Sequence, residues 1–230
     1  MPNVILFGFP HSSFVHIVQL VLTHKEVPYT FHDLEPDMGS PKHLSLHPFD
    51  RVPILQHGEF VIYETSAIVA YLEELFPRPA LQPAQPRDRA LMNQWISSVN
   101  SYYYPYMIYH VGHERNVFPR LGIPSDEKVV AHALPKIEVG LQVVESQLSH
   151  GQGFLLGGEV TLADYYLLPS TFSFSRSDEG KAMYRNYPVF SAWRERMETL
   201  PIVQQLRRVT ADLPPIEHAR KWAVSHRPKY

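Results

Sequence analysis

The stretch HPFDRVPILQHGEFVIYETSAI, residues 47–68, decides how the first third of the chain folds. It predicts a β-hairpin, with strands at Val52–Gln56 and Phe60–Tyr63 joined by a tight turn. A helix is expected over Glu64–Phe76, because apolar residues recur there at helical spacing. Pro53 has no backbone N–H to donate, so it belongs at the start or the edge of its strand.

The residues before this stretch predict a β-α-β unit. Val4–Phe7 is a short continuous apolar run typical of a buried strand. A helix is expected from about Ser13 to Lys25, and the alternation over Tyr29–Leu34 indicates a half-buried second strand. Two strands joined by one helix are parallel with a right-handed crossover. Residues 37–47 are polar and irregular and predict a loop.

The pattern changes after the predicted hairpin and its helix. Residues 77–86 hold four prolines and predict a linker. From Arg87 onward only helical periods occur, and no strand is expected after Tyr63. The chain is therefore expected to be α/β plus all-α, with a first domain over residues 1–78 (β-α-β-loop-β-β-α) and an all-helical domain over 87–224.

Composition excludes several classes of function. The 230 residues carry 21 Lys and Arg against 23 Asp and Glu, so no basic surplus exists to bind nucleic acid. The absence of cysteine excludes disulfides, thiolate metal sites and a cysteine nucleophile. No signal peptide and no apolar run of membrane-spanning length is visible. A cytoplasmic protein without a membrane partner is expected, and any thiol chemistry must use a thiol that a ligand brings.

Two strand-to-helix junctions carry side chains of types that bind ligands or take part in catalysis. Ser12 and Ser13 follow the first strand, at the edge where open α/β sheets bind ligands. Glu64 and Thr65 stand at the start of the helix after the hairpin. Each pair has a structural alternative, because these residue types also cap helix N-termini. The functional interpretation is a carboxylate and hydroxyl pair able to hold the charged ends of an amino acid.

Three motifs together resemble one family. His47–Leu55 is similar to Asn-Pro-Phe-Gly-x-Val-Pro-x-Leu of the cytosolic glutathione S-transferases, and Glu64–Ile68 resembles their Glu-Ser-x-Ala-Ile. Thr161–Asp164 resembles the family's Ser/Thr-x-x-Asp capping box. The resemblance is to the serine-type, phi- or theta-like members. It implies a thioredoxin-like glutathione-binding domain over residues 1–78 and a helical domain over 87–224 that contributes the electrophile site.

The resemblance also implies residue roles. Ser12 aligns with the catalytic serine, with its neighbour Ser13 as the fallback. Pro53 is expected to be the family's cis-proline, and His43 to face the glycyl carboxylate of glutathione. Asp50 replaces a glycine and adds negative charge near an anionic ligand. The residues expected to bind glutathione are His43, Arg51, Val52, Pro53, Glu64 and Thr65.

The second substrate is less well defined by the sequence. The resemblance implies an electrophile site at Phe9, His11, Tyr106 and His110, although an aromatic stripe such as that around Tyr106 also suits a core or an interface. Glutathione is expected as cosubstrate, with a small hydrophobic electrophile as the other ligand, no metal, and a homodimer as the assembly. The alternatives are a non-catalytic binding or regulatory protein, or a glutathione-dependent peroxidase or isomerase.

Overall fold

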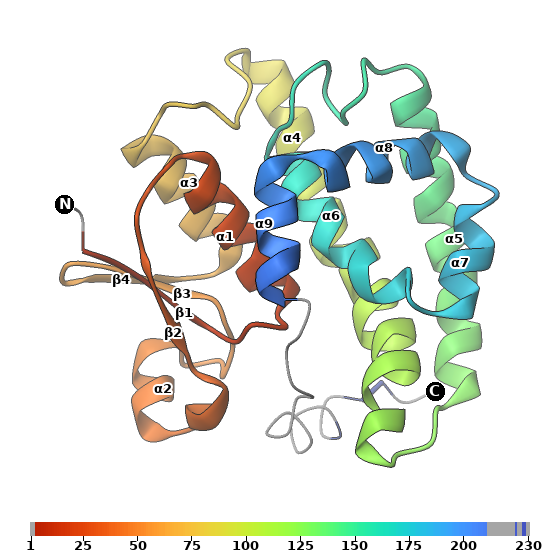
Figure 1. Cartoon of the computed structure of the whole chain (residues 1–230), viewed down its shortest axis with the longest axis horizontal. Coiled ribbons are helices and arrows are strands. Elements are labelled where there is room, and N and C mark those ends of the chain that lie inside the picture. The colour runs from red at the N-terminus through yellow and green to blue at the C-terminus, as the bar shows by residue number, and fades with distance from the viewer. Residues whose placement is uncertain (1–2, 211–223, 225–226, 229–230) are drawn as a thin grey trace. The chain divides into compact units, whose positions relative to one another are not determined.

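The structure is a computed structural model that describes residues 3–210, 224, 227 and 228 (Figure 1). The described residues form two compact units. The first contains the chain up to Leu81 together with helix α9 (Pro201–Thr210), and the second contains the helices between residues 82 and 200. Residues 211–223, at the end of the helical domain expected from the sequence, lie outside the described residues.

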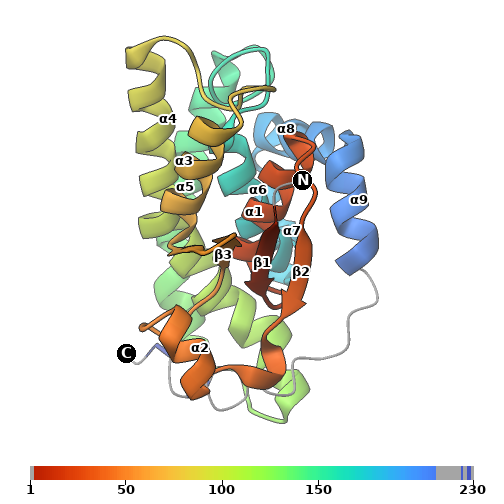
Figure 2. The same ribbon diagram turned by 90° about the vertical axis from the view of Figure 1, so that its left-hand side faces the viewer.

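The first unit is built on a four-stranded mixed sheet of order β2-β1-β3-β4. Strand β1 (Val4–Gly8) pairs in parallel with β2 (Thr30–Asp33), as a one-helix crossover requires. The hairpin strands β3 (Ile54–His57) and β4 (Phe60–Tyr63) run antiparallel to each other, and β3 also pairs antiparallel with β1. Figure 2 shows β2, β1 and β3 side by side. The predicted β-α-β-loop-β-β-α order is confirmed.

Helices α3 (Thr65–Leu75) and α9 both pack on the central helix α1 (Ser13–His24) of this unit. Helix α1 connects β1 to β2 and buries eight of its twelve residues, so it forms the centre of the unit. Helix α3 packs beside it (Figure 1). Helix α9 packs on α1 as well, although its residues were expected to belong to the helical domain. An amphipathic pattern predicts that a helix has a buried face but does not identify the surface it covers.

The sequence interpretation missed a short helix in the predicted loop. Residues 35–46 contain the 3₁₀ turn η1 (Glu35–Asp37) and helix α2 (Pro41–Leu46). Six residues are too few to display a helical period, but the capping signal is present. The Ser40 hydroxyl accepts a hydrogen bond from the His43 N–H at 3.2 Å, and Pro41 occupies the first helical position.

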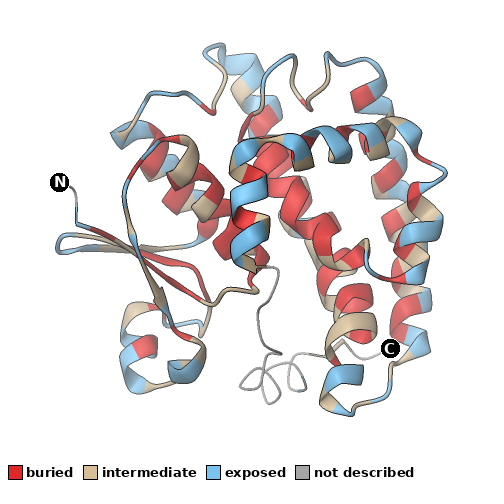
Figure 3. Cartoon of the chain, viewed as in Figure 1, coloured by how far each residue is buried: buried red, intermediate tan, exposed pale blue. Residues whose placement is uncertain are grey.

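The second unit is all-helical, with only an isolated bridge between Phe154 and Gly157 among its described residues. Helix α6 (Leu162–Phe174) is its core, because twelve of its thirteen residues are buried (Figure 3). The predicted capping box is present at Thr161 and Asp164. The other elements are α4 (Pro86–Ser98), the π-helices η2 (Val99–Tyr103) and η3 (Pro105–Val117), the 3₁₀ turn η4 (Pro119–Leu121), α5 (Glu127–Ser149), α7 (Asp178–Tyr184) and α8 (Pro188–Thr199).

Within residues 3–210, 224, 227 and 228, no helix has both the length and the apolar character needed to cross a membrane.

Candidate functional site

The sheet register brings three of the predicted segments to one edge of the first unit. Phe7, near the end of β1, is in register with Ile54 at the start of β3, and Ile54 is in register with Tyr63 at the end of β4. The turn after β1, the residues before β3 and the residues after β4 therefore emerge at the same edge. Three pairs of predicted site residues lie at that edge, beside the ends of the neighbouring strands β1, β3 and β4. These pairs are Ser12 and Ser13, Val52 and Pro53, and Glu64 and Thr65.

Ser12 and Ser13 begin helix α1. Ser12 is the N-cap, and its hydroxyl accepts a long hydrogen bond of 3.4 Å from the Val15 N–H. Ser13 is the first helical residue, and each serine is 8% exposed. Because the Ser12 oxygen acts as an acceptor in the cap, its own hydroxyl proton is left to donate. Ser12 also lies at the N-terminus of α1, where the helix dipole has its positive end.

The turn that holds these serines has an internal support that the sequence interpretation did not single out. His16, one turn along α1, is buried and donates a hydrogen bond of 2.6 Å from Nε2 to the Pro10 carbonyl oxygen. The Ser12 N–H donates to the Phe9 carbonyl oxygen at 3.1 Å. These two bonds fix the turn between β1 and α1. The predicted electrophile residues Phe9 and His11 lie in this turn and are half-buried.

Glu64 and Thr65 occupy the strand-to-helix junction at the start of α3. Glu64 is the N-cap residue of α3, but its side chain makes no cap hydrogen bond and is exposed. Its backbone has φ +69° and ψ 117°, a conformation that costs a non-glycine residue about 1–3 kcal/mol. Thr65 is buried as the first helical residue. A strained junction with a free carboxylate beside a helix N-terminus is typical of a ligand-binding corner.

The residues before β3 form a tightly bonded turn. The peptide bond between Val52 and Pro53 is cis, as the resemblance implies. The Arg51 guanidinium donates to the Asp50 carbonyl oxygen at 3.2 Å, and the Arg51 carbonyl oxygen accepts from His43 Nε2 at 2.9 Å. His43 itself is fully buried, so its contact with a glycyl carboxylate stays a prediction.

His47 and Asp50, the two departures from the family motif, lie in this turn. His47 is 2% exposed, and its ring lies 4.5 Å from the Tyr63 ring. Burial lowers the pKa of His47, with smaller contributions of the same sign from His43 and Arg51 and an opposing one from Asp50. Asp50 has φ +54°, the left-handed region that a glycine occupies without strain. A glycine at this position would adopt the same backbone conformation without strain.

Tyr106 and His110, the other predicted electrophile residues, lie on η3 in the second unit. Their rings are 5.0 Å apart, and His110 Nδ1 donates to the Pro105 carbonyl oxygen at 2.7 Å. Two residues of α5 join them: His132 stacks on His110 at 6.2 Å, and Lys136 lies 5.5 Å from the centre of the Tyr106 ring. Burial lowers the pKa of His110, and the nearby His132 and Lys136 lower it further, against the Pro105 carbonyl and Glu114.

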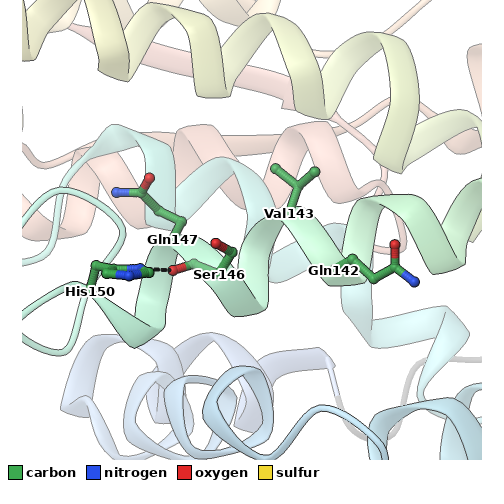
Figure 4. Close-up of a pocket in the computed structure, with 5 residues that line it drawn as sticks. All are labelled: Gln142, Val143, Ser146, Gln147 and His150. Atoms are coloured by element: carbon green, nitrogen blue, oxygen red, sulfur yellow. Dashed lines mark hydrogen bonds between the residues drawn. The ribbon is translucent and has the colours of Figure 1, made fainter.

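A depression in the described surface lies away from the predicted site residues. It measures about 500 Å³ and is lined by five residues of α5 and its C-terminal end (Figure 4): Gln142, Val143, Ser146, Gln147 and His150. It is open to solvent, and none of the predicted site residues lines it. Within the described ranges, no group of three or more His, Asp or Glu side chains is arranged to hold a metal ion.

Comparison with known families decides the assignment. Residues 6–80 match the family description "Glutathione S-transferase, N-terminal domain" and residues 100–201 match "Glutathione S-transferase, C-terminal domain". The chain belongs to the glutathione S-transferase family. The resemblance drawn from the sequence is thereby confirmed, and the chain is an enzyme of this family.

Individual relatives resemble the chain along almost its whole length. A probable glutathione S-transferase of Oryza sativa subsp. japonica is 31% identical over 92% of this chain and 98% of its own. A probable maleylacetoacetate isomerase of Vibrio cholerae is 26% identical, covering 89% and 95% of the two chains. The solved structure of glutathione S-transferase III in its apo form is 27% identical, with a TM-score of 0.82 and coverage of 93% and 99%.

Sequence reasoning missed several residues that contact the predicted site of this glutathione S-transferase. His16 stands four residues after Ser12, a helical spacing that a search for turn-supporting residues would find. His132 and Lys136 are also one helical turn apart, but nothing in the sequence connects α5 to η3. Their contacts with Tyr106 and His110 depend on how the two helices pack.

Proposed function

We propose that the enzyme is a serine-type glutathione transferase in which the Ser12 hydroxyl stabilises the thiolate of bound glutathione. The thiolate sulfur then attacks a small hydrophobic electrophile, forming a carbon–sulfur bond while the leaving group departs with its electron pair. The observation that carries the proposal is the Ser12 cap geometry, in which the hydroxyl accepts from the Val15 N–H and keeps its proton for the sulfur.

The magnitudes fit this role. A free thiol has a pKa of about 8.5, and lowering it by about two units requires about 2.7 kcal/mol of preferential thiolate stabilisation. A hydrogen bond to a charged group contributes roughly 1.5–3 kcal/mol. The N-terminus of α1 adds about 0.3–1 kcal/mol. One hydroxyl at the start of α1 is therefore sufficient without a cysteine, a metal or a second acid.

The remaining residues at the edge of the sheet are proposed to bind the tripeptide. The Val52 backbone, preceding the cis-proline Pro53, would pair with the cysteinyl part of glutathione, and Arg51 lies beside it. Glu64 and the N-terminus of α3 at Thr65 would hold the charged γ-glutamyl end, because an exposed carboxylate suits the ammonium and free N–H groups suit the carboxylate. Phe9 in the first unit and, separately, Tyr106 in the second are aromatic side chains of the kind that suits an apolar electrophile.

The test is turnover with glutathione and an aromatic chloride electrophile. Ser12→Ala is expected to lose most of the turnover, about a hundredfold if the hydrogen bond contributes its usual amount, while the affinity for glutathione changes little. Ser13→Ala is the matched control, since it removes a hydroxyl of equal burial from the next residue. Turnover that survives both substitutions would contradict the assignment of the hydroxyl.

A glutathione-dependent isomerase is the second candidate, because one similar protein is named a probable maleylacetoacetate isomerase. An isomerase uses the same thiolate but returns it, so glutathione is not consumed. Following free thiol during the reaction with a cis-configured α,β-unsaturated diketo acid distinguishes conjugation from isomerisation. Homodimer assembly and a cytoplasmic location stay predictions from the family resemblance.

A further inference from the structure

Three rings and one ammonium group form a cluster where η3 packs against α5 in the second unit. The rings are those of Tyr106 and His110 on η3 and His132 on α5. Their centres lie 5.0 Å apart for Tyr106 and His110, 6.2 Å for His110 and His132, and 6.5 Å for Tyr106 and His132. Lys136 Nζ lies 5.5 Å from the centre of the Tyr106 ring. We call these four residues the ring–lysine cluster.

The Lys136 ammonium lacks an anionic partner within the described part of the chain. It donates a long hydrogen bond of 3.4 Å to the His132 carbonyl oxygen in its own helix, and no described carboxylate lies at ion-pair distance. The side chain is half-buried, so the ammonium has lost part of its hydration. An ammonium has three N–H donors, and one long bond to a neutral carbonyl leaves donors for an anionic ligand.

The carboxylates of the two helices do not compete for this ammonium. Helices η3 and α5 contain four acidic residues, all glutamates, and each has another partner. The partners are Arg227 for Glu114, Arg115 for Glu127, the Tyr187 hydroxyl for Glu138, and two N–H groups at the start of α8 for Glu145. The cluster is therefore a local excess of positive charge.

The rings of the cluster are held in place and are accessible to a ligand. His110 Nδ1 donates to the Pro105 carbonyl oxygen at 2.7 Å, which fixes the orientation of that ring. Tyr106, His132 and Lys136 are half-buried, so solvent reaches each of them in part. Burial lowers the pKa of His110, and His132 and Lys136 add to this effect. A bound anion would reduce the repulsion between these basic groups.

The backbone of η3 is of a kind found frequently at functional sites. Residues 105–117 form a π-helix that follows the π-helix η2 over Val99–Tyr103. π-Helical segments are rare, are mostly limited to a single turn, and occur often at functional sites. Tyr106 and His110 belong to this element, so the unusual backbone and the cluster coincide.

We infer that the ring–lysine cluster selects electrophiles that combine a flat unsaturated group with a carboxylate. The three rings offer contact surface to the flat group, and the Lys136 ammonium offers a charge-assisted hydrogen bond to the carboxylate. The inference rests on the proposed glutathione transferase function, and it narrows the second substrate to an organic acid. His132 and Lys136 thereby become specificity-determining residues.

Three variants isolate the charge of Lys136. Lys136→Met removes the ammonium but keeps an apolar side chain that can cover the Tyr106 ring. Lys136→Arg keeps a positive charge that can lie over the same ring. Lys128→Met is the matched control, because Lys128 is on the same helix but is exposed and contacts no ring among the described residues.

The kinetic test compares a chloronitrobenzoate with its uncharged amide, with chlorine ortho to the nitro group in both. Glutathione sulfur replaces chloride in each reaction. Lys136→Met is expected to lower kcat/KM about five- to tenfold for the benzoate, between the effect of an exposed ion pair and that of a hydrogen bond to a charged group. The loss for the amide should be less than about twofold. Lys136→Arg and Lys128→Met should keep the ratio of the unsubstituted protein. Equal losses for both substrates in Lys136→Met, or the same change of ratio in Lys128→Met, would overturn the inference.

A binding measurement separates this inference from the proposed function. The affinities of meta-nitrobenzoate and meta-nitrobenzamide, which have no halide to lose, are measured by calorimetry without glutathione. The ratio of benzoate to benzamide affinity is expected to fall about five- to tenfold from the unsubstituted protein to Lys136→Met. This fall without any conjugation of the chlorinated substrates would contradict the proposed function but support the cluster as an organic-acid site. A ratio that Lys136→Met leaves unchanged would overturn the inference, whether or not conjugation occurs.

Discussion

Lys25 and Glu73 form a buried ion pair whose disruption we predict to be the most destabilising single change in the first unit. Lys25 Nζ lies 2.7 Å from Glu73 Oε1, and the two side chains are 0% and 2% exposed. Lys25 also donates to the Phe76 and Pro79 carbonyl oxygens at 2.7 and 3.0 Å. Glu73 accepts from the Leu81 N–H at 3.3 Å. The pair thus connects the ends of α1 and α3 to the chain that leaves the unit.

The predicted magnitude follows from these contacts. Lys25→Met leaves the Glu73 carboxylate buried without a cation, for which the usual cost is about 3–5 kcal/mol. The two carbonyl groups also lose their donor, each worth about 1–3 kcal/mol when left unsatisfied, although these costs overlap with the first. We therefore expect a loss of at least about 3 kcal/mol. Because both groups are shielded from solvent, added salt should change this value little.

The assay is urea unfolding followed by circular dichroism at one fixed protein concentration. The double variant Lys25→Met with Glu73→Leu should be more stable than Lys25→Met alone, since it contains no uncompensated buried charge. The resulting coupling energy between Lys25 and Glu73 should be at least about 2 kcal/mol. A loss below about 1 kcal/mol for Lys25→Met, or additive effects in the double variant, would refute this account of the pair.

Three further predictions concern the helical unit. Asp164→Ala should destabilise it by at least about 3 kcal/mol in urea unfolding, because the buried carboxylate accepts from the Leu155 and Thr161 N–H groups, the Thr161 hydroxyl and the Trp193 indole. Burial and nearby His110 lower the pKa of His113 to about 4, so the folded state favours the neutral ring. Up to about 3 kcal/mol of folding stability should therefore be lost as the pH falls from about 6.5 to 4. The His113→Phe variant should not show this dependence of stability on pH. Arg227→Met should cost about 2–4 kcal/mol, measured by thermal unfolding, because it leaves Glu114 buried without the bidentate partner now at 2.9 and 2.6 Å.

Each of these three predictions has an outcome that contradicts it. A loss below about 1 kcal/mol for Asp164→Ala would show that the four donors around the carboxylate are satisfied without it. A pH slope that persists unchanged in His113→Phe would exclude His113 as its source. A loss below about 1 kcal/mol for Arg227→Met would show that Glu114 is satisfied without it.

The sequence predicted most of the fold because its elements have clear local signals. The parallel β-α-β unit, the hairpin and the capping box at Thr161 all follow from local sequence patterns. Helix α2 was missed because its six residues contain less than two turns of pattern. Strand β3 begins at Ile54, two residues later than predicted, since Pro53 has no N–H for the sheet and Val52 precedes it outside the ladder.

The candidate site was predictable to a different degree for each residue. Ser12, Val52 and Glu64 follow from motif positions, and the sheet register explains why they emerge at one edge. The internal contacts of His43 were not predictable, because its partners at Gly39 and Arg51 depend on the path of the turn. Local patterns identify which side chains are available, whereas contacts across a turn or between helices depend on tertiary packing.

The most direct test of the central claim is the titration of the glutathione thiol when bound to the protein, followed by the ultraviolet absorbance of the thiolate. With the unsubstituted protein, the bound thiol should titrate about two units below the free value of about 8.5. With Ser12→Ala it should return most of the way to the free value, and with Ser13→Ala it should not. A bound thiol that titrates like free glutathione, or a depressed pKa that Ser12→Ala leaves unchanged, would contradict the assignment of Ser12.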